Sequence, residues 1–244
     1  MLEWLRNKKS ESLMKKGEEA FAEGEVETAL KFCEQMIGRG YSGGWELKAL
    51  ILASQGKPQE AHQTLLEHLH LHRAASEGKT LRQAELLHVR LLVRAGLFEQ
   101  LDEHTLESSV SLENELLGVA ADECLKSGFR ERGRGYALGL AQLDHDEQDA
   151  FWYIREADNI YSQDTTMFKI TVGGESTLNG RYTCVPYHVA ADDIEAALVF
   201  VREVEPVIPD LALVEIRTQN LQAELPHGVY WRGPWISGSG PEIP

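Results

Sequence analysis

Hydrophobic residues recur with a helical period through the first 145 residues, and glycine interrupts the pattern at regular intervals. The stretch Gly24–Ala29 recurs 32 residues later at Gly56–Ala61, and Gly96–Leu101 recurs at Gly128–Gly133 with the same spacing. Apolar residues at i, i+3, i+4 and i+7 before each glycine predict a helix. Glycine ends such a helix because it adopts a positive φ without steric cost. The sequence therefore predicts a stack of helix–turn–helix units.

Aligning the glycines defines four units, which begin near Ser10, Ser42, Arg82 and Asn114. Three positions of the unit are apolar or small in most copies and are therefore expected to pack. The fourth position holds Leu13, Trp45, Glu85 and Leu117, the eleventh holds Ala20, Leu52, Leu92 and Cys124, and the twentieth holds Ala29, Ala61, Leu101 and Gly133. Neighbouring units must stack to cover these residues, which predicts an α-solenoid with a concave groove.

These positions resemble the tetratricopeptide repeat family. Trp45 matches the family's tryptophan, Gly17 its first glycine, and Ala29 and Ala61 its second-helix alanine. The match is close in the first two units and weaker in the last two, and no unit has the closing proline. The family is a scaffold for binding partner proteins, and on its geometry the first helices line the groove. The resemblance then implies a lining of Glu18, Phe21, Leu50, Arg90, Arg94, Asp122 and Lys126. The alternative is a solvated helix face with no ligand.

The hydrophobic period changes from 3.6 to 2 in the second part of the chain. One more helix, from Asp146 to about Tyr161, is expected to cap the last unit. Strands are then predicted at 168–172, 181–189, 211–217 and 229–231, with a turn region at 173–180. A helix between the second and third strands runs to about residue 205, with Asp192 and Glu195 read as its capping box.

We therefore predict an α+β protein in which an N-terminal α-solenoid is followed by a small ββαβ(β) domain. The helical repeats occupy residues 1–145, and the capping helix with its linker occupies 146–162. The α+β domain occupies 163–236, and 237–244 form a mobile tail.

Charge narrows the classes of partner. The formal net charge is −15, and both halves are acidic: residues 151–244 carry 6 Lys and Arg against 13 Asp and Glu, and the first 150 carry 18 against 26. This balance argues against a nucleic-acid or anionic-membrane binder, because phosphate affinity comes from clustered Lys and Arg. A basic protein is the natural electrostatic partner. The alternative is that acidity serves solubility alone.

Cysteine usage and the chain start bear on localisation. Cys33, Cys124 and Cys184 lie far apart without metal-ligand spacing, which fits reduced thiols. The first residues contain no apolar leader segment, and no stretch approaches the roughly 20 apolar residues of a membrane span. We expect a cytoplasmic protein.

Two motifs suggest ligand sites in the helical part. His68 and His72 share one helix face at i and i+4, which is a metal-ligand spacing. No HExxH arrangement accompanies them, and His68 falls on a packing position, so we expect no metal. Gly133-Arg134-Gly135 suggests a phosphate loop, but it lies in a helix and lacks Gly-Lys-Ser/Thr. Close helix packing accounts for it, and we expect no cofactor.

Candidate chemistry in the second part is sparse. Cys184 and His188 share a strand face but lie four residues apart, about 13 Å along a strand, which is beyond hydrogen-bond reach. The carboxylates Asp192, Asp193 and Glu195 are better explained by helix capping than by catalysis. The aromatics near the chain end either fold onto the sheet or anchor a partner, and Trp231 and Trp235 are the candidates.

The leading hypothesis is a non-enzymatic protein that binds a protein partner, as an adaptor, a secretion chaperone or an immunity protein that neutralises a basic toxin. The alternative is an enzyme with its site in the cleft between the helical and α+β domains, where His188, Asp192 and Arg134 would converge. Self-assembly, with one chain entering the groove of another, is a third hypothesis.

Overall fold

A computed structural model of the protein describes residues 2–74, 78–106, 110–143, 147–178, 180–205, 207–220 and 225–237. The chain divides into two compact units, Met1–Val119 and Ala120–Pro244. The division falls earlier than the boundary near residue 145 that the sequence suggested. The helices between these two points, α8 (Arg130–Leu143) and α9 (Gln148–Asp158), pack against elements of the sheet domain.

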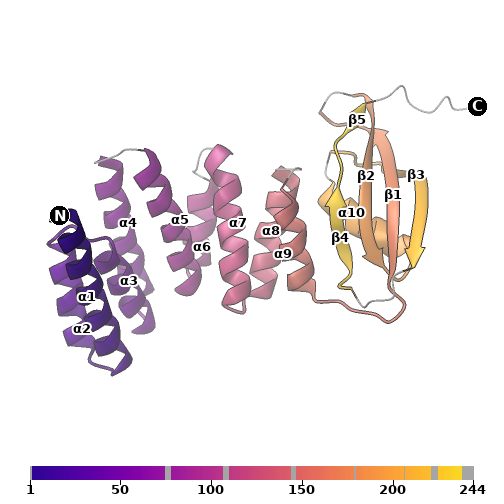
Figure 1. Ribbon diagram of the computed structural model, residues 1–244. Helices are drawn as coiled ribbons and strands as arrows, with labels where there is room; N and C mark the ends of the chain where they lie inside the picture. The colour runs from indigo at the N-terminus through magenta and orange to yellow at the C-terminus, as the bar shows by residue number, and fades with distance from the viewer. Residues whose placement is uncertain are drawn as a thin grey trace, which may run out of the picture. The chain divides into compact units, whose positions relative to one another are not determined.

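The first unit is built of helix pairs, as the repeat predicts (Figure 1). They are α1 (Leu2–Ala22) with α2 (Val26–Ile37), α3 (Gly43–Ser54) with α4 (Pro58–Ala74), and α5 (Gly78–Arg94) with α6 (Phe98–Leu106). The next helix, α7 (Val110–Lys126), crosses into the second unit. The glycine between the helices of each pair has a positive φ: 80° at Gly24, 71° at Gly56 and 68° at Gly96. The predicted helix ends are confirmed.

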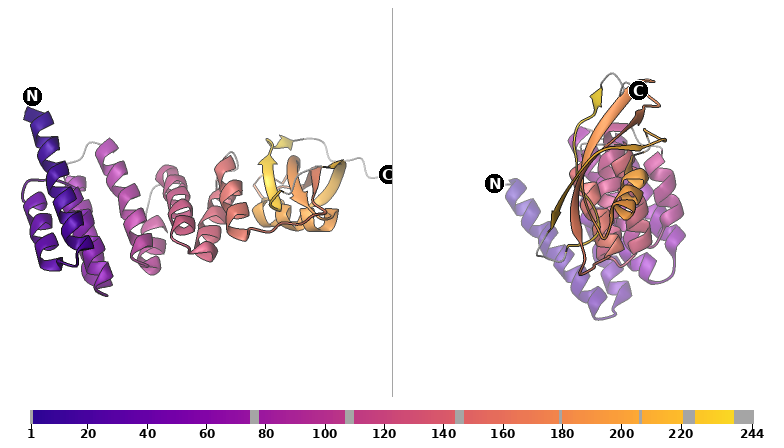
Figure 2. Two further views of the ribbon diagram at one scale, coloured as in Figure 1. Left: turned by 60° about the horizontal axis from the view of Figure 1, so that its bottom comes forward. Right: turned by 90° about the vertical axis from the view of Figure 1, so that its right-hand side faces the viewer.

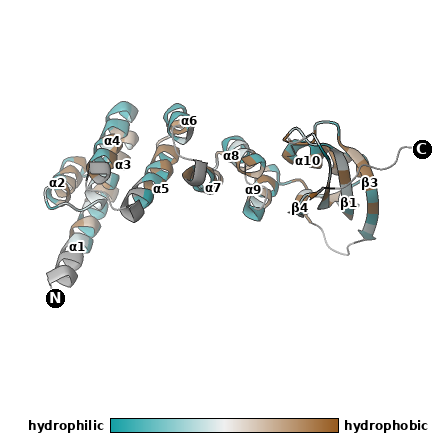
Figure 3. Cartoon of the chain, turned by 90° about the horizontal axis from the view of Figure 1, so that it is seen from above, coloured by the Kyte–Doolittle hydropathy of each residue, from teal (hydrophilic) through white to brown (hydrophobic). Residues whose placement is uncertain are grey.

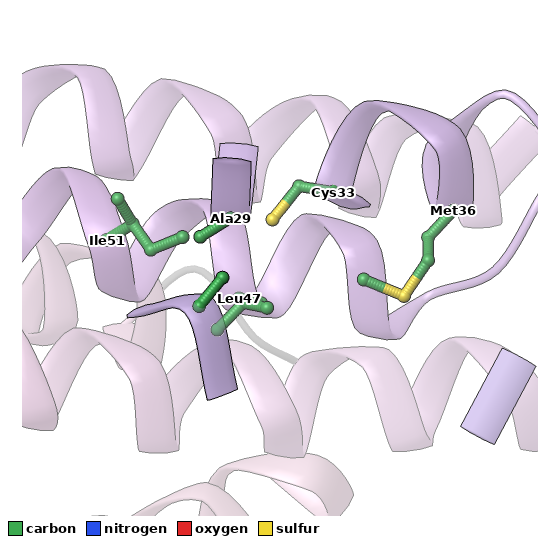
Figure 4. Packing of buried hydrophobic residues seen from close by; sticks show 6 residues of the cluster. Ala29, Cys33, Met36, Leu47 and Ile51 are labelled. Carbon is green, nitrogen blue, oxygen red and sulfur yellow. The ribbon is translucent and has the colours of Figure 1, made fainter. Parts of the chain in front are cut away.

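The core of the first pair also includes α3 (Figure 4). Ala29, Cys33 and Met36 of α2 face Leu47 and Ile51 of α3, and all five are buried. Burying an aliphatic side chain of this size stabilises the fold by about 1.5–3 kcal/mol. Ala29 is the small residue of the twentieth repeat position. Its complete burial confirms that two helices meet there.

Close packing also joins the first helices of successive pairs. A Cβ atom placed on Gly17 of α1 would lie 2.7 Å from Leu47 Cδ2 of α3, so Leu47 would have to shift to admit a side chain at this position. α3 contacts α5 as well as α1. The first helices of the three pairs are therefore neighbours.

The sheet belongs to the second unit and confirms the α+β class. Its elements are β1 (Thr166–Glu175), β2 (Tyr182–Ala191), α10 (Ile194–Val204), β3 (Ala212–Asn220), β4 (Gly228–Arg232) and β5 (Ile236–Ser237). The strands pair antiparallel in the order β3-β1-β2-β4, and β5 pairs with β2. Thr183, Val185, Tyr187 and Val189 are buried on one face of β2, as the alternation predicts.

α10 covers one face of the sheet (Figure 2). Its cap corrects the sequence prediction: Asp193, not Asp192, is the N-cap, and its carboxylate accepts a hydrogen bond from Ala196 N at 2.8 Å. Glu195 lies within the first turn, so no capping box forms with Asp192. The helix starts one residue later than expected because Asp193 holds the extended backbone that an N-cap requires.

Two more boundaries differ from the sequence prediction. β1 continues through Gly173 and Gly174, where a turn was expected. Ser237, the first residue of the predicted tail, belongs to β5 and pairs with Thr183 of β2. The rest of the predicted tail, 238–244, lies outside the described residues. Within the described part of the chain, no helix combines the length and hydropathy needed to cross a membrane.

Candidate partner-binding surfaces and a buried histidine cluster

The residues expected to line a groove lie mostly on neighbouring first helices of the first unit. Glu18 on α1 and Arg90 and Arg94 on α5 are exposed, while Phe21 on α1 and Leu50 on α3 are half-buried. Phe21 packs against the core cluster of α1 to α3. The structure thus places five of the seven predicted residues on the three first helices α1, α3 and α5, and this set includes both charged and apolar side chains.

The other two predicted groove residues, Asp122 and Lys126, lie on α7 in the second unit. They form an ion pair of 2.5 Å across one helical turn. Such exposed pairs add little stability, about 0.3–0.5 kcal/mol.

A charge interaction links α3 to α5 in the first unit. Burial raises the pKa of Glu46 above its usual range, and the guanidinium of Arg94 opposes this shift. Arg94 therefore stabilises the Glu46 carboxylate as well as forming part of the exposed surface.

Exposed carboxylates gather at the turn between α1 and α2. Glu18, Glu23, Glu25 and Glu27 are all exposed there. Glu19 is also exposed, but Lys15 lies 3.7 Å from its carboxylate. This end of the first helix pair is strongly acidic.

The sheet face opposite α10 carries the aromatic side chain predicted as an anchor. The ring of Trp231 lies against His188, tilted by 42° with 4.8 Å between ring centroids, and Trp231 is still 38% exposed. Burial lowers the pKa of His188, and the ammonium of Lys169 lowers it further. Trp235 is 37% exposed, and the Arg232 guanidinium lies 5.1 Å from its ring centroid. Each tryptophan ring thus contacts a side chain of the second unit on one side and is partly exposed to solvent.

β3 forms one end of the strand order, so no described strand pairs with its outer edge. Leu213, Val214 and Ile216 are exposed apolar residues of this strand. Hydrophilic and hydrophobic residues are mixed along it (Figure 3). An edge strand with exposed apolar side chains can pair with an extended segment of another protein.

The side chains named for the enzyme alternative all belong to the second unit, and each has separate contacts. Arg134 donates to Asp158 at 2.5 Å and to Glu203 at 2.6 and 2.7 Å. Asp192 lies 3.4 Å from His227, and His188 lies against Trp231. These contacts do not bring Arg134, His188 and Asp192 to a common reacting centre.

Thr165, His227 and Asp192 have the residue types of a catalytic triad but not its geometry. Thr165 Oγ1 lies 3.0 Å from His227 Nε2, and Asp192 Oδ1 lies 3.4 Å from the same nitrogen. A catalytic histidine needs its two ring nitrogens on different partners, one orienting the ring and one accepting the proton. The Thr165 hydroxyl instead donates to Ser162 O at 2.8 Å, so the group anchors the loop before β1.

A buried ion pair connects β4 to the end of α10. The Arg232 guanidinium donates to Glu205 Oε2 at 2.7 Å, and the Tyr187 hydroxyl donates to the same oxygen at 2.7 Å. All three residues are buried. Because the two charges compensate each other, this network is a structural element of the sheet core.

Gly133 allows α8 to pack closely against α7, as predicted. A Cβ atom there would lie 3.2 Å from Ala121 O, Cys124 Cβ and Leu125 Cδ2, all on α7. The Gly133-Arg134-Gly135 stretch lies inside α8 and therefore forms no phosphate loop.

A cluster of histidines and one carboxylate lies inside the first unit, and the sequence analysis missed it. Glu85 and His88 stand at i and i+3 on α5, and His104 comes from α6. One ligand atom of each lies within 4.8 Å of the others. Glu85 is 4% and His88 3% exposed, and the His104 side chain is 11% exposed. The ring of His62 on α4 stacks on His88 with 6.0 Å between centroids.

Burial dominates the electrostatics of this cluster. Burial, together with the neighbouring His104 and His62, lowers the pKa of His88 to about 3. Burial also lowers the pKa of His62. The imidazole of His88 is therefore neutral near pH 7 and can offer a lone pair.

The histidine pair noted in the sequence is a different one. His68 is buried and stacks on Trp45 with 6.2 Å between ring centroids, and the side chain of His72 lies outside the described residues. The overlooked signal was Glu85, a carboxylate in a repeat position that is otherwise apolar.

Among the described residues, the structure thus offers three candidate features: exposed side chains on the first helices, a sheet face that ends at the edge strand β3, and a buried cluster of metal-binding residue types. Comparison of the chain with protein-family models, with curated proteins and with solved structures finds no match.

Proposed function

We propose that the protein is a non-enzymatic module that binds a basic protein partner through tetratricopeptide-like helix pairs. The observation that carries this proposal is the contact of α3 with both α1 and α5. It makes the first helices neighbours, so that Glu18, Leu50 and Arg90 are available to one ligand. Stacked helix pairs use such a surface for extended segments of other proteins.

Charge supports a basic partner. The net charge is −15, and the turn between α1 and α2 concentrates exposed carboxylates, among them Glu18 and Glu25. Complementary charge accelerates association and selects against acidic competitors. An adaptor, a secretion chaperone or an immunity protein against a basic toxin all fit this chemistry.

The open sheet face offers the second unit its own contact surface. Trp231 places a partly exposed aromatic ring there, and tryptophan is over-represented among the residues that dominate binding energy. Cys33, Cys124 and Cys184 are thiols that form no disulfide with one another, which supports action in the reducing cytoplasm.

The test begins with affinity purification of the protein from its native cells and identification of a stoichiometric partner. Binding to the purified partner is then measured over a salt series for the wild type and for Glu18→Lys combined with Glu25→Lys. We expect roughly tenfold weaker binding and a flatter salt dependence in the double variant, because rim charges mainly steer association. Glu67→Lys combined with Glu99→Lys is the matched control, since it makes the same charge change at exposed positions on the second helices α4 and α6.

Two results would contradict the proposal. One is a protein that retains no stoichiometric partner. The other is an affinity that stays the same in the double variant and at high salt. A Trp231→Ala variant reports separately on the sheet face, because a loss confined to this variant would move the binding surface to the second unit.

A further inference from the structure

We propose that Glu85, His88 and His104 bind one transition-metal ion, and that Zn²⁺ is the ion their chemistry favours. The three residues come from two helices, and one donor atom of each lies within 4.8 Å of the others. The spacing of Glu85 and His88 at i and i+3 on α5 points both side chains to the same neighbour, α6, which supplies His104.

His88 is the residue that an ordinary ion pair does not explain. Glu85 Oε2 and His104 Nε2 are 2.7 Å apart, so these two groups compensate each other. His88 lies beside them, 3% exposed, and neither of its ring nitrogens has a hydrogen-bond partner among the described residues. A buried polar group left in this state costs about 1–3 kcal/mol. A metal ion would accept one of its lone pairs.

The repeat makes Glu85 equally unusual. The other three units place Leu13, Trp45 and Leu117 at this fourth position. A carboxylate buried in an apolar packing position destabilises the fold unless a positive charge compensates it. His104 faces this carboxylate at 2.7 Å, and a divalent cation bound by the same groups would bring two positive charges to it.

The donor set selects the ion. Two imidazole nitrogens and one carboxylate oxygen suit Zn²⁺, Co²⁺, Ni²⁺ and Cu²⁺, whereas Mg²⁺ and Ca²⁺ prefer oxygen donors. In a tetrahedral Zn²⁺ site with bonds of about 2.0–2.2 Å, the ligand atoms lie roughly 3.3 Å apart. The donor atoms of the three residues now lie within 4.8 Å of one another, and small side-chain rotations would bring them to the separation of such a site. His62 on α4 offers a further buried nitrogen, Nδ1, which has no hydrogen-bond partner among the described residues.

Burial assigns the site a structural role. The ligands are almost fully covered, so a substrate has no access to the ion, which is the character of structural zinc sites. The ion would join α5 to α6 and thereby hold the third helix pair together. Its binding free energy would add to the stability of the first unit. This inference is independent of the protein-binding function.

The test uses the full chain without an affinity tag, because tag histidines bind Zn²⁺ themselves. The protein is stripped with a chelator, dialysed and titrated with Zn²⁺ in competition with a chromophoric chelator. We expect one Zn²⁺ per chain and an affinity at least roughly 100-fold lower in His88→Leu and in Glu85→Gln, because each loses a ligand. His70→Ala is the matched control, since His70 is an exposed histidine on the neighbouring α4. It should bind Zn²⁺ as the wild type does.

A second measurement keeps the proposal testable if a variant fails to fold. X-ray absorption of the wild type loaded with Zn²⁺ should show nitrogen and oxygen ligands only, since no cysteine is part of the cluster. Thermal unfolding should shift upward with Zn²⁺ and not with Mg²⁺. The absence of stoichiometric binding, sulfur ligation, or an equal loss of affinity in His70→Ala would each overturn the proposal.

Discussion

At the scale of the residue, His88 is held where its charged form is disfavoured. His88 has its pKa lowered to about 3 by burial, and the groups around it are His62 and His68 on α4, Glu85 on α5 and His104 on α6. The unfolded chain therefore takes up a proton below about pH 6.5 that the folded chain does not. This contribution leaves stability unchanged above pH 6.5 and lowers it as the pH falls from 6.5 towards 3.

We expect His88→Leu to reduce the slope of unfolding free energy against pH between 6 and 4 by up to about 1.4 kcal/mol per pH unit. Urea unfolding at several pH values, with a chelator present, measures the slope. Carboxylates contribute equally to the slopes of the wild type and of His88→Leu, so the difference between the two slopes reports the contribution of His88. Identical slopes would show that His88 is protonated in the folded state.

At the scale of the element, the contact between α7 and α8 depends on Gly133, one of the three glycines in α8. Gly133→Leu should destabilise the protein by about 1–3 kcal/mol, because three atoms of α7 stand 3.2 Å from the position of a Cβ. Gly135→Ala is the control. Nothing lies within 4 Å of its Cβ position, and replacing a helical glycine should stabilise by about 0.5–1 kcal/mol. Chemical denaturation compares the two variants, and equal effects would contradict this packing.

At the scale of the whole molecule, net charge dominates colloidal behaviour. The chain carries a formal charge of −15 at pH 7 and has a sequence pI of about 5.0. Repulsion between copies should therefore disappear as the pH approaches 5. We expect light scattering to rise sharply between pH 6 and 5 and to stay low at pH 7.5. A dilution series at pH 7.5 separates this effect from specific self-assembly, which would persist where the net charge is large.

Much of the local architecture could be predicted because it depends on neighbouring residues in the chain. Gly24, Gly56 and Gly96 end their helices by a backbone preference of glycine itself, and the alternation from Thr183 to Val189 follows from the geometry of a strand. The errors arise where a distant segment decides. Gly173 and Gly174 continue β1 by pairing with β2. A larger residue would not fit there, because a Cβ on Gly174 would lie 2.5 Å from Ile208 Cγ2 and one on Gly173 would lie 2.8 Å from the Tyr182 hydroxyl. These glycines permit close packing in a strand, a role that sequence alone does not separate from a turn.

The sequence by itself therefore determined the helix pairs, the change to strands and the acidic character, since each follows from periodicity, backbone preference or composition. Only the tertiary structure decided which side chains meet. Glu85 and His88 are one turn apart on α5, but His104 joins them only because α6 folds back against α5. The packing of elements distant in sequence brings donors together in a buried volume. No local spacing in the sequence encodes this juxtaposition, which forms the proposed metal site.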